Sequence, residues 1–276
     1  MPAKPQPTAH DRDRLLILGC GYVGSRVLDA ARRAGSTVDA LTRNPETCER
    51  LRERGASLVV ESHLDDPAWH RELDPSDYAA IVLSVGSSES TEAGYRKSYL
   101  EGVSSVLEWI ASKRGGVELP PRLIYTSSIS VYSGDEGQWV DERALIEPAT
   151  WRGRIIRESE QRIEDRFPGQ AFTLRLGGIY GPDRNRFLRS GGRRAPDSTE
   201  DYYLNLIHVD DIASAILALI HNPPAESAIY NLTDGNPILR SELDAWTAEH
   251  LPASPDNTPP PRRRSRWTGW CAGRRG

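Results

Sequence analysis

The feature that most constrains this chain is a glycine-rich turn, Gly19-x-Gly21-x-x-Gly24, between two stretches of different periodicity. The stretch before it, RLLILG, is a short apolar run of the kind that forms a buried strand. The stretch after it has apolar residues at helical spacing and closes at Gly35. A strand, this turn and a helix in succession predict the first unit of a nucleotide-binding fold.

Each glycine of this turn has its own physical reason. Gly19 permits the tight bend, Gly21 lets a pyrophosphate approach the backbone, and Gly24 lets the helix pack on the strand. The helix N-terminus offers N–H donors and the positive end of a dipole to the phosphates. A tight turn with no ligand is the simpler alternative. The residues predicted to bind a dinucleotide cofactor here are Gly19, Gly21, Tyr22, Val23 and Gly24.

The rest of the chain continues the alternation of strands and helices. Further strands are predicted at residues 37–43, 56–60, 78–85, 122–128, 171–181 and 228–235. Helices are predicted at residues 45–55, 95–110, 148–165, 209–222 and 239–251. Because right-handed crossovers join parallel strands, this alternation predicts an α/β fold with a Rossmann-like, doubly wound parallel sheet.

The pattern divides the chain into three parts. Residues 1–13, polar and Pro-rich, are predicted to be a disordered leader, and residues 252–276, Pro- and Arg-rich without periodicity, a disordered tail. Residues 14–251 are predicted to form the nucleotide-binding domain, with a small C-terminal substrate-binding part mainly at residues 177–251. Within it, the polar stretch at residues 183–203 is expected to form a loop at the mouth of a cleft.

Composition narrows the classes of function. A formal net charge of −4 and a pI near 5.9 do not suggest a nucleic-acid binder. No apolar run is long enough to cross a bilayer, so no membrane partner is expected. Cys20, Cys48 and Cys271 lie far apart without a C-x-x-C pair, so the sequence predicts neither a disulfide framework nor a Cys-type metal site. A reducing cytoplasm fits this usage.

The end of the predicted second strand, ALTRNP, bears on the type of dinucleotide. An NAD-preferring site usually has Asp or Glu here, roughly 20 residues after the glycines, to bond the ribose 2′-hydroxyl. This chain has Arg43, whose guanidinium can pair with a 2′-phosphate. The sequence therefore predicts NADP(H) in preference to NAD(H), and an ordinary surface arginine is the alternative.

Five segments carry a resemblance to a known family: GCGYVGSRV, LIYTSSISVYS, LGGIYGPDRN, NLIHVDDIASAI and YNLTDG. With these motifs in this order, residues 14–251 resemble the extended short-chain dehydrogenase/reductase superfamily, in its NAD-dependent epimerase/dehydratase branch. The chain looks most like the short, atypical members known as nucleoside-diphosphate-sugar epimerases. The resemblance implies a small-molecule substrate, with a nucleotide sugar as the leading candidate, and a homodimer formed through two long helices.

The resemblance also implies roles for residues at the strand ends. In YTSSISVYS, the position of the family's serine that bonds the substrate hydroxyl or carbonyl is Ser128. In LSVGSS, Ser84 and Val85 fall in the segment that lines the cofactor. In NLIHVDDIA, His208 is implied to hold the start of the following helix rather than to act as a base.

The family's Tyr–Lys dyad has no counterpart in this sequence. In the family the Tyr passes a proton to the reacting oxygen, and the Lys four residues later holds the nicotinamide ribose. Aligning WRGRIIRESE on the family's Y-G-x-S-K-x-x-x-E puts Arg152 and Ile156 at these positions, and none of the ten Tyr is followed by Lys at the fourth residue. Three interpretations stay open: an epimerase, dehydratase or reductase that takes its proton from water or the substrate, a non-catalytic NADP(H)-binding sensor or scaffold, and a module that binds no nucleotide.

Overall fold

A computed structural model describes residues 14–87, 89–112, 122–133, 137–185, 201–222 and 228–251. The predicted leader at residues 1–13 and the predicted tail at residues 252–276 lie outside the described residues, as does most of the predicted loop at residues 183–203. In the described ranges, no helix combines the length and the apolar character that crossing a membrane requires.

The centre of the molecule is a parallel sheet, and within the described residues it has seven strands in the order β10-β6-β5-β4-β1-β2-β3. Its strands are β1 (Arg14–Leu18), β2 (Thr37–Thr42), β3 (Leu58–Glu61), β4 (Ala80–Leu83), β5 (Arg122–Ser128), β6 (Ala171–Leu176) and β10 (Ile229–Leu232). From β1 the chain builds first toward β3 and then, from β4, in the other direction. The strand order therefore reverses between β1 and β4, where ligands bind in such sheets. The predicted Rossmann-like fold is confirmed.

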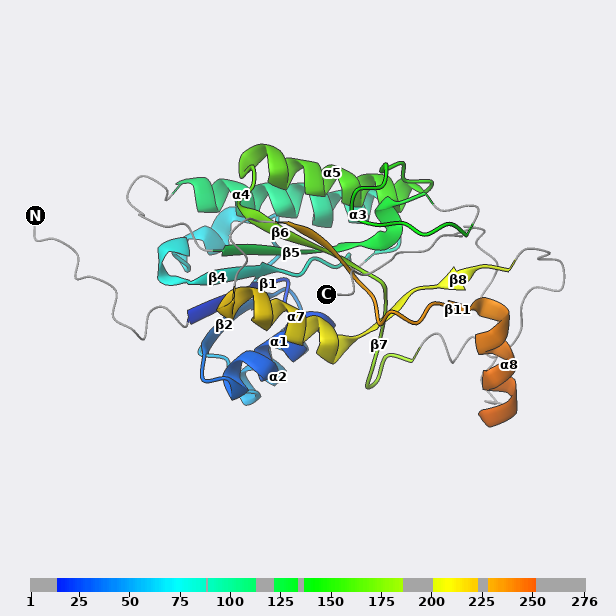
Figure 1. Ribbon diagram of the computed structural model, residues 1–276. Helices are drawn as coiled ribbons and strands as arrows, with labels where there is room; N and C mark the ends of the chain where they lie inside the picture. The colour runs from blue at the N-terminus through cyan, green and yellow to red at the C-terminus, as the bar shows by residue number, and fades with distance from the viewer. Residues whose placement is uncertain are drawn as a thin grey trace, which may run out of the picture.

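Helices cover both faces of this sheet (Figure 1). One layer contains α1 (Tyr22–Arg33), α2 (Pro45–Glu53) and α7 (Val209–His221), and the other contains α4 (Gly102–Ser112) and α5 (Trp151–Arg166). A short helix, α3 (Glu92–Arg96), continues through a π-helical turn (Lys97–Glu101) into α4.

The first strand shows why this sheet needs two layers. Leu15 and Ile17 pack in the apolar cluster under α1 and α7, whereas Leu16 and Leu18 pack in the cluster under α4. All four side chains are buried. Because successive side chains of a strand point to opposite faces, a continuous apolar run is expected only where both faces are covered.

The second half of the chain contributes to the sheet and also extends beyond it. Strand β10 and helix α7 belong to the central body, where α7 packs on α1. A short pair, β7 (Gly178–Tyr180) and β9 (Leu206–His208), lies beside the cleft. Another pair, β8 (Tyr203–Leu204) and β11 (Ile238–Leu239), leads to α8 (Arg240–His250), which projects from the body in Figure 1. The substrate-binding role of residues 177–251 stays a prediction.

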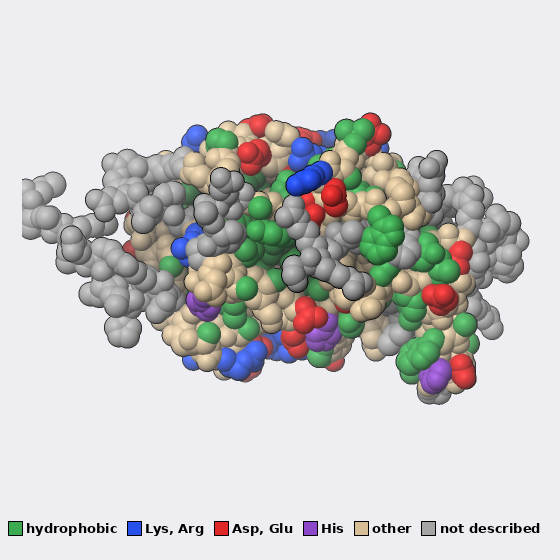
Figure 2. Space-filling view, in the orientation of Figure 1, with side chains coloured by type: hydrophobic (Ala, Val, Ile, Leu, Met, Phe, Trp, Pro, Cys, Tyr) green, Lys and Arg blue, Asp and Glu red, His purple; other side chains and the backbone are tan. Residues whose placement is uncertain are grey.

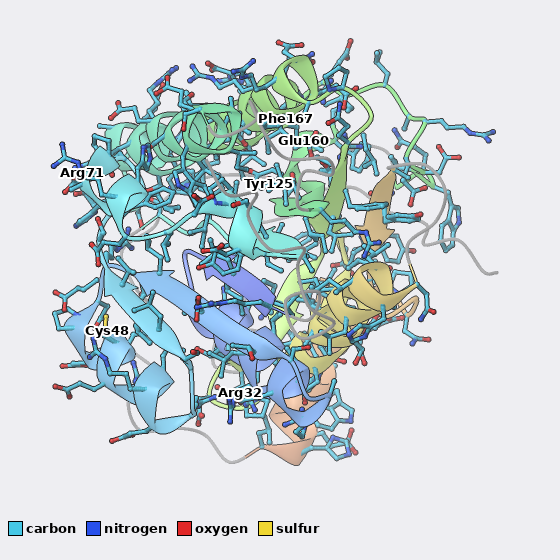
Figure 3. All side chains as sticks on the ribbon, turned by 90° about the vertical axis from the view of Figure 1, so that its left-hand side faces the viewer. Arg32, Cys48, Arg71, Tyr125, Glu160 and Phe167 are labelled. Carbon is cyan, nitrogen blue, oxygen red and sulfur yellow. The ribbon has the colours of Figure 1, made fainter. Side chains whose placement is uncertain are left out.

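A buried ion pair joins this sheet to α5. Arg175 on β6 donates from Nε and Nη2 to the two carboxylate oxygens of Glu160, at 2.9 and 2.8 Å. Burial lowers the pKa of Arg175 and the Glu160 carboxylate raises it, and the net effect is a rise. Ser127 at the end of β5 donates to Glu160 at 2.6 Å, and Arg175 donates to the Tyr132 hydroxyl at 2.6 Å. Figure 3 labels Glu160 in the layer between α5 and the sheet.

The surface carries both signs of charge. On the face drawn in Figure 2, acidic and basic side chains are interspersed over the helical layers. The described residues on that face form no large patch of a single sign.

The start of α5 lies directly against the turn after β5. Thr150 caps this helix by accepting from the backbone N–H of Gly153 at 3.1 Å. A Cβ atom added at Gly153 would lie 2.2 Å from the carbonyl oxygen of Ser130. Glycine at this position therefore lets the first turn of α5 approach the end of β5.

Replacing Gly153 by alanine is expected to destabilise the protein. The added Cβ would meet the Ser130 backbone, which cannot move as cheaply as a side-chain end. We expect the free energy of unfolding to fall by about 1–3 kcal/mol, although alanine gains about 1 kcal/mol in helix propensity. Urea denaturation measures this. Gly86→Ala is the control, because its Cβ would meet nothing within 4 Å, and equal losses in the two variants would contradict the packing argument.

Candidate functional site

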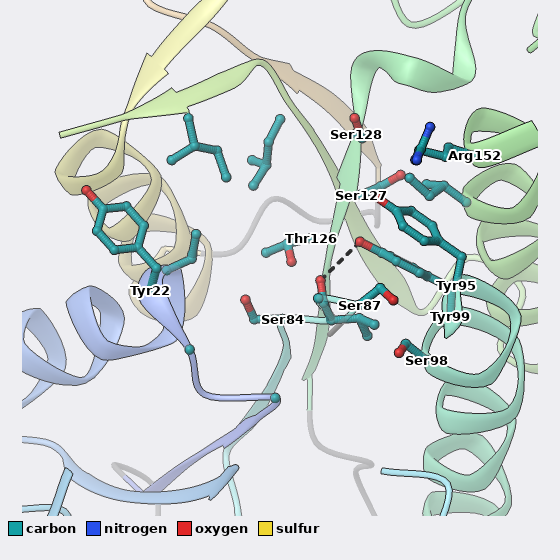
Figure 4. Close-up of a pocket in the computed structure, with 18 of the residues that line it drawn as sticks. Tyr22, Ser84, Ser87, Tyr95, Ser98, Tyr99, Thr126, Ser127, Ser128 and Arg152 are labelled. Atoms are coloured by element: carbon teal, nitrogen blue, oxygen red, sulfur yellow. Dashed lines mark hydrogen bonds between the residues drawn. The ribbon is translucent and has the colours of Figure 1, made fainter. Parts of the chain in front are cut away.

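A cleft of about 900 Å³ lies at the carboxyl ends of the strands around the β1–β4 reversal. Figure 4 shows its walls: the start of α1 on one side, the ends of β4 and β5 in the middle, and α3, α4 and α5 on the other side. Its volume lies within the range of about 300–1,000 Å³ that ligand pockets span. Every residue predicted from sequence to belong to the site lines this cavity except Gly24.

The glycine turn closes one end of the cleft. Gly19 has a φ of +75°, and a Cβ atom there would lie 2.5 Å from the carbonyl oxygen of Ser84. Gly21 is different, because an added Cβ would have only the Gly19 carbonyl oxygen within 4 Å, at 3.9 Å. Gly24 does not line the cleft, and its Cβ would lie 3.0 Å from both Cys20 Sγ and Ile17 Cγ2. The turn thus leaves open space around Gly21, whereas Gly24 packs tightly against Cys20 and Ile17.

The N-terminus of α1 faces this open space. Gly21 is its N-cap residue and provides no side-chain cap, and the first turn of the helix contains no acidic residue. Tyr22 and Val23 line the cleft, and the Tyr22 hydroxyl donates to the carbonyl oxygen of Pro182 at 2.8 Å. The backbone N–H groups and the positive end of the helix dipole suit an anionic group here.

Arg43 lies where β2 ends and lines the cleft half-buried. Among the described residues it has no carboxylate within ion-pair distance. The acidic residue of this strand, Asp39, lies away from the cleft, where it accepts from Arg14 at 2.7 Å and from the Tyr78 hydroxyl at 2.9 Å. A cation is therefore the charged group that β2 presents at the cleft.

The ends of β4 and β5 form the middle of the cleft. Ser84 and Val85 line it, and the Val85 carbonyl oxygen accepts from the Tyr99 hydroxyl at 3.3 Å. The Ser127 hydroxyl already donates to the Glu160 carboxylate, as described above. The Ser128 hydroxyl oxygen accepts from the backbone N–H of Ser130 at 3.2 Å, which leaves its proton for another acceptor. Ser128 is thus the hydroxyl of this strand end best placed to bond a ligand oxygen.

The first turns of α5 bring Arg152 and Ile156 to the same cleft. Arg152 donates from Nη2 to the carbonyl oxygen of Ser90 at 3.0 Å. Its guanidinium lies over the rings of Trp151, at 4.2 Å, and Tyr95, at 5.5 Å. Ile156 is buried in an apolar cluster. A fixed cation and an apolar side chain therefore occupy the positions that the family alignment assigned to the phenol and the amine.

The cleft residues that were not predicted as site residues include Tyr95, Lys97 and Tyr99. Tyr95 and Tyr99 stack at 5.3 Å, and the Lys97 ammonium lies 3.4 Å from an Asp65 carboxylate oxygen. Burial, and then the neighbouring Tyr95, raise the pKa of Tyr99. The sequence predicted a helix at residues 95–110, and both tyrosines recur at helical spacing with the apolar residues of that helix. Their hydroxyls were the signal that this face meets a polar cavity.

Two further predictions concern helix starts. The Nδ1 atom of His208 accepts from the backbone N–H of Asp210 at 3.2 Å and so caps α7, which is the structural role expected for it. Cys20 lies directly in the glycine turn but is fully buried. Burial raises the pKa of its thiol to about 12, which opposes any nucleophilic role. Among the described residues, no group of three or more His, Cys, Asp or Glu could hold a metal ion.

Comparisons with known proteins agree with this fold. The sequence model of the NAD dependent epimerase/dehydratase family matches residues 15–233. Protein YeeZ of Escherichia coli (strain K12) is 28% identical over 222 residues, which cover 79% of this chain and 77% of that protein. A 4-hydroxy-2-methyl-3-oxo-4-farnesyl-3,4-dihydroquinoline-1-oxide ketoreductase of Stigmatella aurantiaca is 24% identical over 238 residues, which cover 82% of this chain and 69% of that protein.

Solved structures show the same fold. The UDP-glucose 4-epimerase of Thermotoga maritima, solved with UDP-glucose, is similar with a TM-score of 0.69 at 18% identity. The match covers 86% of this chain and 82% of that chain.

The burial of Cys20 predicts how its thiol reacts. With a pKa of about 12, only about one thiol in ten thousand is ionised near pH 8, and the side chain is also inaccessible. We expect iodoacetamide to leave Cys20 unmodified in the folded protein and to modify it in urea. Peptide mass spectrometry measures this. Modification at similar rates in both states would contradict the packing of the glycine turn.

Proposed function

Because this chain belongs to the NAD-dependent epimerase/dehydratase family, we propose that it is an NADP(H)-dependent oxidoreductase acting on a carbonyl compound or the corresponding alcohol. The observation that carries this proposal is the continuity of the cleft. One cavity runs from the glycine turn, past Arg43 and Ser84, to Ser128. A cofactor end and a substrate end therefore share one space, as hydride transfer between them requires.

The residues present fit a dinucleotide. The open space above Gly21 and the uncapped start of α1 suit the pyrophosphate, which a side chain at that position would obstruct. Tyr22, Val23, Ser84 and Val85 would hold the rest of the cofactor along the cleft. The nicotinamide, when bound, supplies or accepts the hydride.

Arg43 supports the choice of NADP(H). Its guanidinium lies at the end of β2, where a ribose 2′-group is bound in such folds, and no described carboxylate neutralises it. A 2′-phosphate would provide the missing counter-charge through charge-assisted hydrogen bonds. A 2′-hydroxyl would leave the cation unpaired.

Ser128 is the residue that would hold the reacting oxygen, by donating its hydroxyl proton to a carbonyl or accepting from an alcohol. A guanidinium serves as a hydrogen-bond donor rather than as a general acid, and the side chain of Ile156 has no acidic proton. We therefore assign the proton to water or to the substrate itself, and Ser128 has a binding role rather than an acid–base role.

Two substrate classes have support. The ketoreductase from Stigmatella aurantiaca acts on a ketone, and its similarity over most of this chain favours carbonyl reduction. The Thermotoga maritima protein is a UDP-glucose 4-epimerase solved with UDP-glucose, so a nucleotide sugar is the second candidate. Binding of UDP-glucose in the presence of NADP⁺ would favour the second class.

A different class of function is a non-catalytic NADP(H)-binding sensor or scaffold. The observation that favours it is Ile156, an apolar side chain where the family alignment places the ribose-binding Lys. Loss of general acid catalysis typically costs about 10²–10⁴ in rate. Substrate-dependent oxidation of NADPH would exclude this alternative.

A homodimer and a cytoplasmic location also remain predictions. Light scattering would measure whether the protein is a dimer.

Arg43→Ala tests the cofactor. We expect wild-type protein to bind NADPH more tightly than NADH, and the variant to lose about tenfold or more of its NADPH affinity while its NADH affinity is unchanged. A fluorescence titration with each nucleotide measures this. The control is Arg50→Ala, an exposed arginine of α2 outside the cleft. Equal binding of NADPH and NADH by the wild type would contradict the preference.

Ser128→Ala tests catalysis. Removing a donor aimed at the reacting oxygen is expected to lower kcat by about 10²-fold or more, with the affinity for NADPH unchanged. The measurement is NADPH oxidation with whichever ketone a screen identifies. Unchanged kcat in this variant would remove Ser128 from the mechanism, and NADPH binding without turnover of any ketone by the wild type would favour the sensor.

A further inference from the structure

The cleft carries more positive than negative charge. Among the described residues that line it, the basic side chains are Arg43, Lys97, Arg152 and Arg184, and the acidic side chains are Asp65 and Glu89. The charge of Lys97 is offset by the carboxylate of Asp65. The Arg184 guanidinium lies over the Tyr22 ring, 5.1 Å from its centroid, beside the start of α1. Arg43 is assigned above to the cofactor. Arg152 is the cation at the Ser128 end.

The position of Arg152 is fixed by three contacts. Its Nη2 atom donates to Ser90, and its guanidinium lies over Trp151 and Tyr95. None of these contacts supplies a negative charge. Within the part of the chain that the structure describes, no carboxylate lies within 4.0 Å of its nitrogen atoms. Among the described residues, this cation in the cleft therefore has no counter-ion.

Arg152 lies at the Ser128 end of the cleft. The close approach of Gly153 to the Ser130 carbonyl brings the first turn of α5 against the turn after β5. Figure 4 shows Arg152 and Ser128 at the same end of the pocket.

We propose that Arg152 binds an oxyanion carried by the substrate, and that the substrate is an anionic ketone whose acidic group is attached close to the carbonyl held by Ser128. This inference rests on the proposed function and names its substrate class. A planar guanidinium donates two parallel hydrogen bonds to a carboxylate or a tetrahedral oxyanion. Arg152 stands at the position where the family has its proton-donating Tyr, and in this proposal it serves substrate selection instead.

The competing explanation is that Arg152 only stabilises the fold by covering the Trp151 and Tyr95 rings. Such stacking occurs at protein surfaces and needs no ligand. The two explanations differ in whether binding depends on the charge of the ligand, so the experiment varies that charge while the ketone stays the same.

Three ketones provide the comparison. Phenylglyoxylate, benzoylphosphonate and acetophenone share a phenyl ketone and carry, on the carbonyl carbon, a carboxylate, a phosphonate and a methyl group. Isothermal titration calorimetry of the full chain, with and without saturating NADP⁺, gives their affinities without requiring turnover. We expect at least one charged ketone to bind wild-type protein about tenfold or more tightly than acetophenone. The carboxylate and phosphonate arms identify which oxyanion the site prefers.

Variants then test whether Arg152 causes the tighter binding of the charged ketone. Arg152→Met is expected to abolish the advantage of the charged ketone, and Arg152→Lys to retain part of it, because the ammonium keeps the charge but not the planar fork. Arg166→Met is the matched control: it removes an arginine that also lies over an aromatic ring, Phe167, at the far end of the same helix.

The outcomes separate this inference from the proposed function. Equal affinities for the three ketones in wild-type protein, no binding of any of them, or a charge preference that survives in Arg152→Met would each overturn the inference. NADPH titrations of the same proteins test the cofactor separately. Failure to bind NADPH would overturn the proposed function, and the calorimetry without cofactor would still decide the oxyanion site.

Discussion

The Glu160–Arg175 ion pair is the interaction on which the rest of the site depends. Both side chains are buried, and breaking such a pair typically costs about 3–5 kcal/mol because the remaining charge is left without a partner. The pair ties α5 to β6, and Ser127 extends the connection to the end of β5. Because Ser128 follows Ser127 directly, the charged pair beneath the cleft fixes the strand end that would meet a substrate.

Much of the fold could be predicted because short-range physics decides it. The apolar run at residues 15–18 specifies a strand covered on both faces, and the spacing of Gly19, Gly21 and Gly24 specifies the turn after it. Arg175 could not be predicted. Its segment, AFTLRL, has the alternation of an ordinary strand, and only the position of Glu160 on the preceding helix explains a fully buried guanidinium.

The cleft was predicted only in part, for a related reason. A helical stripe that contains Tyr95 and Tyr99 is the same in sequence whether it meets apolar core or a polar cavity. What distinguishes the two is which neighbours the fold provides, here the ends of β4 and β5 and the guanidinium of Arg152. Arg152 itself could be placed from sequence, because Gly153 and Glu160 keep the family's spacing around it.

The π-helical turn at Lys97–Glu101 has a consequence for how this wall of the cleft could change. A π turn accommodates about one residue more than an α-helical turn, and each residue of an α-helix rotates the chain by about 100°. Because the extra residue is absorbed within one turn, deleting a single residue there would restore a regular helix and leave the segments on either side, including Tyr95, close to the direction they now face. The length of this wall could therefore change by one residue at this turn without re-aiming its two ends.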